Sequence, residues 1–149
     1  MSREEQEAEE LSLKTFTVLT RAAQAVKKQA EEDIRQHGLN PTEFAVLELL
    51  YHKGEQPIQK IGGKVLIASS SITYVVDKLE KKAYLSRRPC PTDRRVTYAS
   101  LTEEGTDLMN EIFPKHRQRM HDVLGGVTED EKTSLIELMK KLGMHAGSL

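Results

Sequence analysis

The sequence predicts a mainly α-helical protein of the α+β class, with one short β-hairpin among the helices. Apolar residues recur at spacings of three and four along most of the 149 residues, which is the period of an amphipathic helix. Helix-start motifs separate these stretches, and strand-favouring residues are concentrated in 84–101. Because a chain of this length is about one domain, we expect residues 1–149 to form a single domain.

The first predicted helix spans residues 5–37, which hold no Gly or Pro and are rich in Ala, Glu, Gln and Lys. Gly38 supplies its stop. This helix is long for so small a domain, which favours an intermolecular use. Its apolar stripe consists of Leu11, Val18, Leu19, Ala22, Val26, Ala30 and Ile34.

Three more helices are expected before residue 84. The motif Asn40-Pro41-Thr42-Glu43 combines a cap, a proline at the first helical position and a glutamate at the third, and it predicts a helix that ends at Gly54. Pro57 opens a short helix from Ile58 to about Val65. A turn at 66–68 follows, and then a helix from Ser69 to about Ala83. The inward face of that helix is Ile72, Val75, Val76 and Leu79.

Residues 84–101 predict the β-hairpin, because Leu85, Val96, Thr97 and Tyr98 favour strands and prolines punctuate the segment between them. Its tip is long and basic. Thr102-Glu103-Glu104 then starts a helix that Pro114 is expected to kink and that Gly125-Gly126 ends. The capping box Thr128–Glu131 starts the last helix.

Composition excludes several classes of protein. No apolar run approaches the roughly 20 residues of a membrane span, so a membrane partner is not expected. The acidic start of the chain lacks the apolar core of a secretory signal. Cys90 is the one cysteine, so an internal disulfide is excluded. With a mean hydropathy of -0.53, these features favour a cytoplasmic protein.

Charge is distributed unevenly although the net charge is only -1. Residues 57–100 carry nine Lys and Arg against three Asp and Glu, whereas the segments on both sides are acidic. This pattern predicts a local surface that binds a polyanion. The alternative is a solvated basic surface with no partner.

Two short helices, a tight turn and a basic hairpin together predict a winged helix-turn-helix over residues 40–101, a fold that binds double-stranded DNA. Hydroxyls at the start of the helix over 69–83 can donate to phosphates or to base edges, although one serine must serve as the cap. Arginine can enter a narrow minor groove, and a neighbouring aspartate can orient it. The candidate DNA contacts are Ser69, Ser70, Ser71, Thr73, Tyr74, Lys78, Arg87, Arg88, Asp93, Arg94 and Arg95.

The order of elements resembles the MarR (multiple antibiotic resistance regulator) family over nearly the whole chain. Three motifs carry the resemblance: Ser70-Ser71-Ile72-Thr73 with Val76-Asp77-Lys78-Leu79-Glu80, then Asp93-Arg94-Arg95, and Leu101-Thr102-Glu103-Glu104-Gly105. The family implies a homodimeric transcriptional regulator in which segments 5–37 and 102–146 form the dimerisation region; no cofactor is expected. It also implies that the helix over 69–83 meets the major groove, that Arg95 reaches the minor groove beside Asp93, and that Arg94 meets the backbone. Two such half-sites predict a pseudo-palindromic operator.

Members of the family commonly release DNA when a small effector acts on them. The runs 39–50 and 71–82 are especially similar to the branch that represses quinone and catechol resistance, which implies a phenolic or quinone-like effector in a stress response. Phe16, Phe44, Glu48 and His116 are the candidate residues of an aromatic pocket with polar groups. The alternative for His116 is a core histidine with a bonded partner, and for Glu48 a surface position.

Two other functional readings remain open. Cys90 lies among four arginines that can lower its pKa, so a thiol switch is possible, although an incidental thiol is favoured. A helical adaptor that has kept the fold without DNA affinity is a second alternative. Catalysis is not expected, because the sequence shows no phosphate loop or nucleophile elbow. The five histidines have no metal-ligand spacing, so no metal site is expected.

Overall fold

The computed structural model describes residues 1–64 and 69–149, apart from the side chains of Ser69 and Ser70. The predicted helix end at Val65 and the predicted turn at 66–68 lie outside the described residues. Within the described part, the elements run in the order α1 (Arg3–Gln36), α2 (Pro41–Lys53), β1 (Gln56–Pro57), α3 (Ile58–Lys64), α4 (Ser69–Lys81), β2 (Leu85–Pro89), β3 (Thr97–Leu101), α5 (Glu103–Val123), the 3₁₀ turn η1 (Leu124–Gly126) and α6 (Glu129–Gly147).

Capping residues set the helix starts. Asn40 accepts a hydrogen bond from the backbone N–H of Glu43, and the Glu43 carboxylate accepts one from the backbone N–H of Asn40, which confirms the predicted start of α2. The same reciprocal pair at Ser2 and Glu5 starts α1 two residues earlier than predicted. After α1, Gly38 has a φ of +81°, the left-handed conformation that glycine adopts easily.

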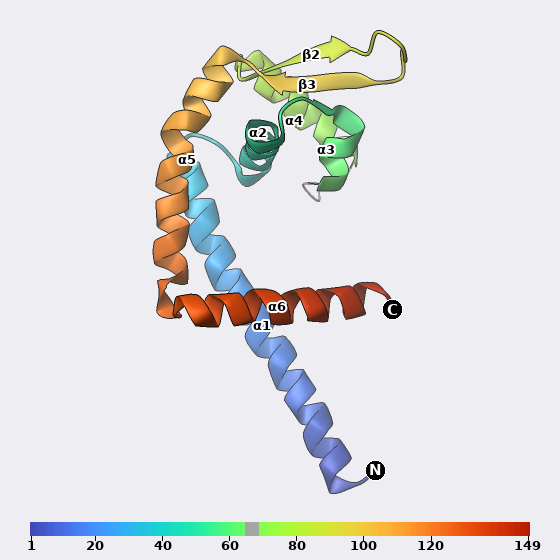
Figure 1. Cartoon of the computed structure of the whole chain (residues 1–149), viewed down its shortest axis with the longest axis vertical. Helices are drawn as coiled ribbons and strands as arrows, with labels where there is room; N and C mark the ends of the chain where they lie inside the picture. The colour runs from blue at the N-terminus through green and yellow to red at the C-terminus, as the bar shows by residue number, and fades with distance from the viewer. Residues whose placement is uncertain (65–68) are drawn as a thin grey trace.

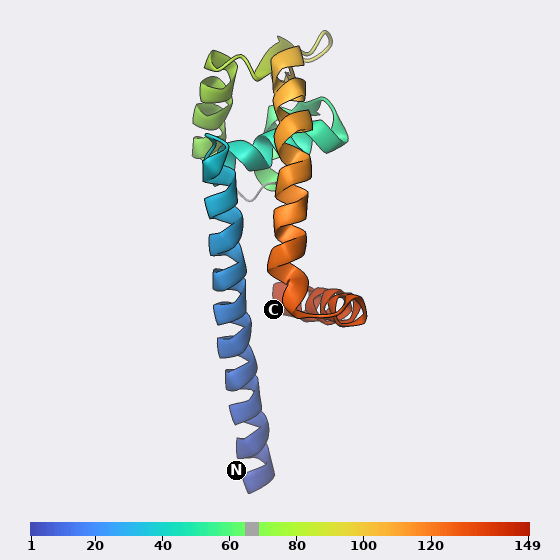
Figure 2. The same cartoon turned by 90° about the vertical axis from the view of Figure 1, so that its left-hand side faces the viewer.

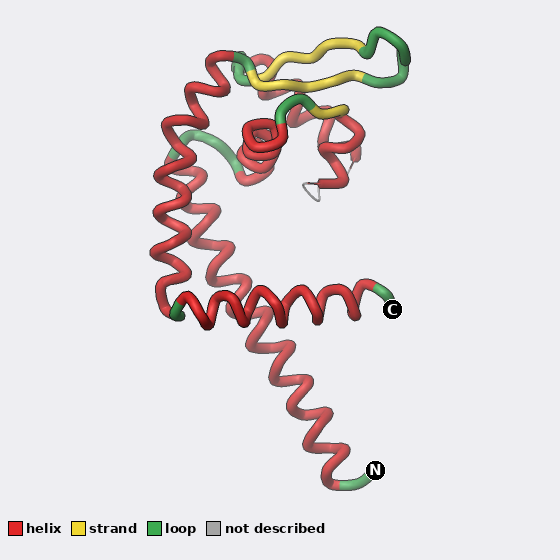
Figure 3. Tube along the Cα trace, viewed as in Figure 1, coloured by secondary structure: helices red, strands yellow, loops and turns green. Residues whose placement is uncertain are grey.

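A three-stranded antiparallel sheet forms where the sequence predicts a hairpin. Its strand order is β1-β3-β2, with Leu85 opposite Leu101 at the base and Pro89 opposite Thr97 near the tip. Strand β1 was not predicted from the sequence, and it places Gln56 opposite Ala99. The hairpin and its loop form the wing (residues 85–101), which extends beyond the helices (Figure 3).

The apolar core lies in the winged part of the molecule, between α2, α3, α4, the sheet and the first half of α5. Val76 and Leu79 of α4 are fully buried there, together with Leu47 of α2 and Met109 of α5. The inward face predicted for α4 is therefore confirmed. This core fixes α4 against the sheet and leaves its opposite face in solvent.

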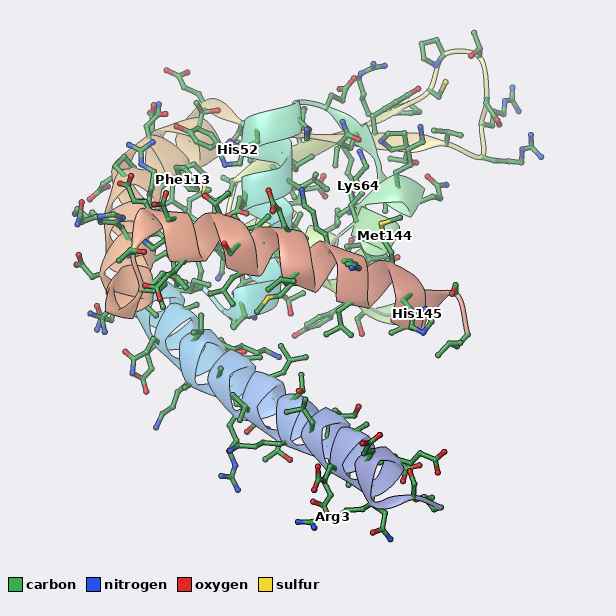
Figure 4. The ribbon with its side chains drawn as sticks, turned by 60° about the horizontal axis from the view of Figure 1, so that its bottom comes forward. Arg3, His52, Lys64, Phe113, Met144 and His145 are labelled. Atoms are coloured by element: carbon green, nitrogen blue, oxygen red, sulfur yellow. The ribbon has the colours of Figure 1, made fainter. Side chains whose placement is uncertain are left out.

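The long helices lie largely outside this core. The C-terminal half of α1 lies along α5, while its N-terminal half projects far beyond the rest of the chain (Figures 1 and 2). Helix α5 continues on both sides of Pro114. Helix α6 turns away from α5, and nearly all its residues are exposed (Figure 1). Arg3 and Met144 mark the far ends of α1 and α6 in Figure 4. Among the described residues, no helix is long and apolar enough to cross a membrane.

Candidate nucleic-acid interface

Helix α4 presents a polar outward face. Ser71, Thr73 and Tyr74 are exposed, and the Tyr74 residue retains 69% of its accessible surface. The buried apolar residues of α4 lie on the opposite side of the helix, so packing in the core does not account for a tyrosine at position 74. Ser69 and Ser70 belong to the first turn, but their side chains lie outside the described residues.

A buried carboxylate attaches the other end of α4 to α2. Glu43 is only 2% exposed, and its carboxylate lies 2.7 Å from Lys82 Nζ and 3.8 Å from Lys78 Nζ. Burial raises the pKa of Glu43, but the hydrogen bonds from Lys82 and Asn40 and the two ammonium charges outweigh it, so the pKa lies below its ordinary value. The predicted DNA contact Lys78 is thus half-exposed and already close to a carboxylate.

The loop of the wing presents Arg94 and Arg95 to solvent. The Arg95 side chain is 89% exposed, and the Asp93 carboxylate accepts hydrogen bonds from its guanidinium at 3.2 and 3.3 Å. Asp93 also accepts from the backbone N–H of Arg95 at 3.0 Å. These bonds lower the pKa of Asp93 and hold the exposed arginine in one orientation, as the sequence predicts.

Arg87 and Arg88 lie nearer the base of the wing and already have carboxylate partners. Arg87 Nη2 lies 2.7 Å from Asp77 and 2.9 Å from Glu80, both on α4. The hydrogen bonds that Arg87 donates to the Glu80 carboxylate raise the pKa of Arg87. A phosphate would have to compete with these carboxylates for the Arg87 guanidinium.

Arg88 is bound in the same way to the segment before β1. Its guanidinium donates two hydrogen bonds to the Glu55 carboxylate, at 2.6 and 2.9 Å, and its central carbon lies 4.7 Å from the centre of the Tyr98 ring. The two arginines that the sequence groups with Arg94 and Arg95 therefore tie the wing to α4 and to the segment before β1.

Cys90 is half-buried at the start of the wing loop. Its Sγ lies 3.4 Å from the Thr92 hydroxyl. This contact has the largest effect on the pKa of the thiol and lowers it, and hydrogen bonds from the backbone of Thr92 and Asp93 lower it further. Among the described residues, no group of three His, Cys, Asp or Glu side chains is arranged to hold a metal ion.

The structure does not bring the four predicted effector residues together in one chain. Phe44 and His116 are in contact, with ring centres 4.7 Å apart. Phe16, on the projecting half of α1, is 67% exposed. Glu48 is half-buried at a different place, an open hollow of about 300 Å³ between α2 and α3, where Figure 4 labels His52 and Lys64.

His116 has the bonded partner that the alternative reading requires. Its Nδ1 lies 2.9 Å from the buried Asp33 carboxylate, and His37 Nε2 lies 3.8 Å from the same oxygen. The burial of Asp33 and Glu43 was not predicted from the sequence. The position of Asp33 next to Ile34 on the inner side of α1 is a signal for burial, whereas the lysine partners of Glu43 lie far away in the sequence.

Comparison with known proteins identifies relatives of the chain. A model of the MarR family matches residues 39–97. The HTH-type (helix-turn-helix) transcriptional regulator MhqR of Bacillus subtilis (strain 168) is 53% identical over 137 residues, which are 92% of this chain and 94% of that protein.

Solved structures share the fold. Sco3205, a MarR family transcriptional regulator from Streptomyces coelicolor solved in complex with DNA, has a TM-score of 0.79 at 21% identity, with 96% of this chain and 88% of that chain covered. NadR, solved in complex with 4-hydroxyphenylacetate, has a TM-score of 0.71 at 23% identity, with 85% and 89% covered.

Proposed function

The chain belongs to the MarR family of transcriptional regulators, and we propose that it is a homodimeric repressor that binds a pseudo-palindromic operator. A small phenolic or quinone-like effector releases it from this DNA. The role is binding rather than catalysis, and it is exercised in the cytoplasm, where bacterial operators lie.

The observation that carries the proposal is the exposed Arg95 at the wing tip, oriented by Asp93, on a wing that is tied to α4. Arg87 links β2 to Asp77 and Glu80, so the wing and the outward face of α4 form one unit. The major and minor grooves of B-DNA adjoin, so a helix that reads the major groove can be accompanied by an arginine in the neighbouring minor groove. Ser69, Ser70, Ser71, Thr73, Tyr74 and Lys78 are the proposed contacts of the helix.

Within the wing, we assign different roles to the arginines. Arg94 and Arg95 contact the duplex, Arg94 at a phosphate and Arg95 in the minor groove. Arg87 and Arg88 act first as supports of the wing, because their guanidinium groups are bound to carboxylates within the chain. Any phosphate contact that they make is secondary to this support.

Dimerisation through segments 5–37 and 102–146 is supported by the exposed apolar side chains on α1 and α6. An open groove of about 460 Å³ runs between these helices, and its lining is almost entirely apolar. Monomeric proteins rarely expose such continuous apolar surface. The lining residues are Leu11, Lys14, Thr15, Val18, Leu19, Ala22, Leu135, Leu138, Met139 and Leu142.

The effector class rests on the resemblance of residues 39–50 and 71–82 to the quinone- and catechol-responsive branch. Reversible binding near Phe44 and His116 or in the hollow at Glu48 is the first route. Phe16 could take part only across the dimer, since it lies on the projecting half of α1. A thiol route through Cys90 is the second, because hydrogen bonds lower the pKa of that thiol and so favour the reactive thiolate.

A titration of labelled DNA duplexes tests the proposal. Fluorescence anisotropy is measured with duplexes from upstream of the gene and with random duplexes, at several salt concentrations. We expect tight, salt-dependent binding to one upstream duplex, because phosphate contacts release counterions. If the protein binds no duplex even at low salt, and instead co-purifies with protein partners, the adaptor alternative is supported.

Addition of phenols, quinones and oxidants to the bound complex then separates the two effector routes. Release that persists in Cys90→Ser and is weakened in Glu48→Ala or His116→Ala supports the reversible pocket. Release by quinones that disappears in Cys90→Ser supports the thiol route.

A further inference from the structure

We propose that Gln59 is a positioning residue for the wing, and that it sets where Arg95 enters the minor groove relative to the bases read by α4. This inference rests on the proposed function, since it needs Arg95 to contact DNA. Gln59 is exposed on the first turn of α3, far from Arg95 in the sequence.

The side-chain amide of Gln59 donates a hydrogen bond to the backbone carbonyl of Arg95, with 2.9 Å between Nε2 and O. Asp93 holds the same residue from the other side, through the backbone N–H and the guanidinium of Arg95. The loop is closed internally by bonds from Cys90 N to Val96 O and from Val96 N to Asp93 O. Those bonds shape the loop, and among the hydrogen bonds of residues 1–64 and 71–149 the Gln59 contact is the one that joins it to the helices.

The pairing of the sheet explains why this contact is needed. The β1–β3 ladder ends with Pro57 opposite Tyr98, and a proline has no N–H to continue it. Beyond that point α3 begins and the backbone of the chain turns away from β3. The Gln59 amide supplies a donor just past the end of the ladder and so extends the attachment of the wing toward its tip.

The base of the wing is already attached elsewhere. Arg87 binds Asp77 and Glu80, and Arg88 binds Glu55. Loss of the Gln59 contact should therefore leave the fold and the base of the wing intact while the loop with Arg95 becomes free to shift. The expected defect is in where Arg95 reads DNA, and much less in how strongly the protein as a whole is attracted to DNA.

Selection of DNA from a random pool measures this directly. The wild-type protein is incubated with duplexes that contain about 30 randomised base pairs, enough for two half-sites about one turn apart. Bound duplexes are sequenced after several rounds. We expect conserved bases in each half-site and, at one fixed distance from them, a preference for A·T pairs, whose narrow minor groove attracts arginine.

Two variants separate the inference from the function that it presupposes. Arg95→Ala should keep the half-site bases and lose the A·T preference. Gln59→Met has a side chain of similar length without the donor, and it should keep the A·T preference but spread it over neighbouring positions. Its binding to the selected wild-type duplex should weaken several-fold, and duplexes with the A·T step moved by one base pair should bind nearly as well as the original.

Lys60→Met, at the exposed position next to Gln59 on α3, is the matched control and should keep the A·T preference at one fixed position, as in the wild type. Thermal unfolding should be unchanged in Gln59→Met and Lys60→Met, because both sites are exposed. If Arg95→Ala loses the A·T preference but Gln59→Met keeps it at one fixed position, the positioning role is refuted and the proposed function stands. If the wild-type protein enriches no sequence, both are refuted.

Discussion

At the scale of single residues, the four arginines of the wing show how neighbours decide what one side chain can do. Arg87 and Arg88 each meet carboxylates from α4 or from the segment before β1. The Arg95 guanidinium is held by the neighbouring Asp93 and stays exposed, so its charge is oriented and remains available to a ligand. Sequence composition treats all four as one basic cluster, whereas the structure divides it into supports and contacts.

The first prediction concerns Arg95. We expect Arg95→Ala to weaken binding to the selected operator about tenfold or more, because one oriented base-edge or minor-groove contact contributes about 1–3 kcal/mol. Fluorescence anisotropy at fixed salt measures the affinity, and sedimentation checks that the oligomeric state is unchanged. Arg3→Ala, at an exposed arginine that precedes the dimerisation segment, is the control. Unchanged affinity in Arg95→Ala would show that the wing does not contact DNA.

The second prediction concerns Glu43. We expect Glu43→Gln to lower the free energy of unfolding by about 2 kcal/mol at pH 7, because the variant leaves the nearby Lys82 ammonium without its buried counter-charge. Glutamine still accepts from the backbone N–H of Asn40, so the cap of α2 is kept. Denaturant unfolding measures the difference between wild type and variant.

The pH dependence of this difference follows from the sign of the pKa shift. The pKa of Glu43 is lower in the folded protein than its ordinary value of 4.5, so the carboxylate stabilises the fold above that pH. This stabilisation is lost as the pH falls through the folded-state pKa. The gap between wild type and Glu43→Gln should therefore be largest near neutral pH and shrink as the pH falls below 4.5 and through the lower folded-state pKa. Glu5→Gln, at the equivalent but exposed position of α1, should show little effect at either pH.

The part of the site that depends on residues close together in the sequence could be predicted. The part that depends on contacts between distant segments could not. Asp93 and Arg95 are two residues apart, so their pairing could be inferred from the sequence. Glu43 and Lys82 are brought together only by the packing of α2 against α4. Similarly, Phe44 and His116 meet as predicted, while Phe16 lies on a part of α1 that its own chain does not cover.

At the scale of elements, helix boundaries were predictable because they depend on caps a few residues long. The predicted starts at Asn40, Thr102 and Thr128 are all confirmed. Strand β1 was not predicted because it is two residues long and includes a proline, so it has no alternation to detect. It exists because β3 offers an edge to which it can pair.

The start of α5 gives the third prediction. Gly105 is buried in its first turn, and a Cβ at this position would collide with the backbone carbonyl of Tyr84. That carbonyl is fixed, because it accepts a hydrogen bond from the backbone N–H of Thr102 at 3.1 Å. We expect Gly105→Ala to destabilise the protein by about 2–3 kcal/mol, since the backbone must shift to make room.

Thermal unfolding at one protein concentration measures this effect, because the melting temperature of an oligomer depends on concentration. We expect a fall of roughly 5–10 °C. Gly63→Ala in α3 is the control, since a Cβ there meets no atom within 4 Å. It should raise stability by up to about 1 kcal/mol, because alanine favours helix. Equal melting temperatures for Gly105→Ala and the wild type would contradict the steric explanation.

At the scale of the whole molecule, the apolar surface of α1 and α6 is not accounted for by one chain. Large apolar residues on both helices are exposed, and the core of the winged part does not reach them. A second copy could cover this surface and would also place two copies of α4 at a fixed separation. Affinity for a two-part operator would then depend on contacts far from the DNA.

The fourth prediction tests this dependence with Leu138→Asp. Leu138 lies in the groove between α1 and α6 and is 61% exposed in the single chain. If a partner covers it, a carboxylate there is buried without a counter-charge, at a cost of several kcal/mol. We therefore expect the variant to sediment as a monomer at micromolar concentration, where the wild type sediments as a dimer. Because a monomer meets only one half-site, its operator affinity should fall by at least a hundredfold.

The matched control is Lys140→Asp, which introduces the same carboxylate two residues along α6, on the opposite side of the helix. It should sediment as the wild type does, so a change confined to Leu138→Asp identifies the apolar groove rather than added charge as the cause. Dichroism should show that the winged core, to which α6 contributes no buried residue, remains folded. A Leu138→Asp variant that still sediments as a dimer would require the two copies to meet on another surface, and the separation of the two α4 helices would then have to be set by that surface instead.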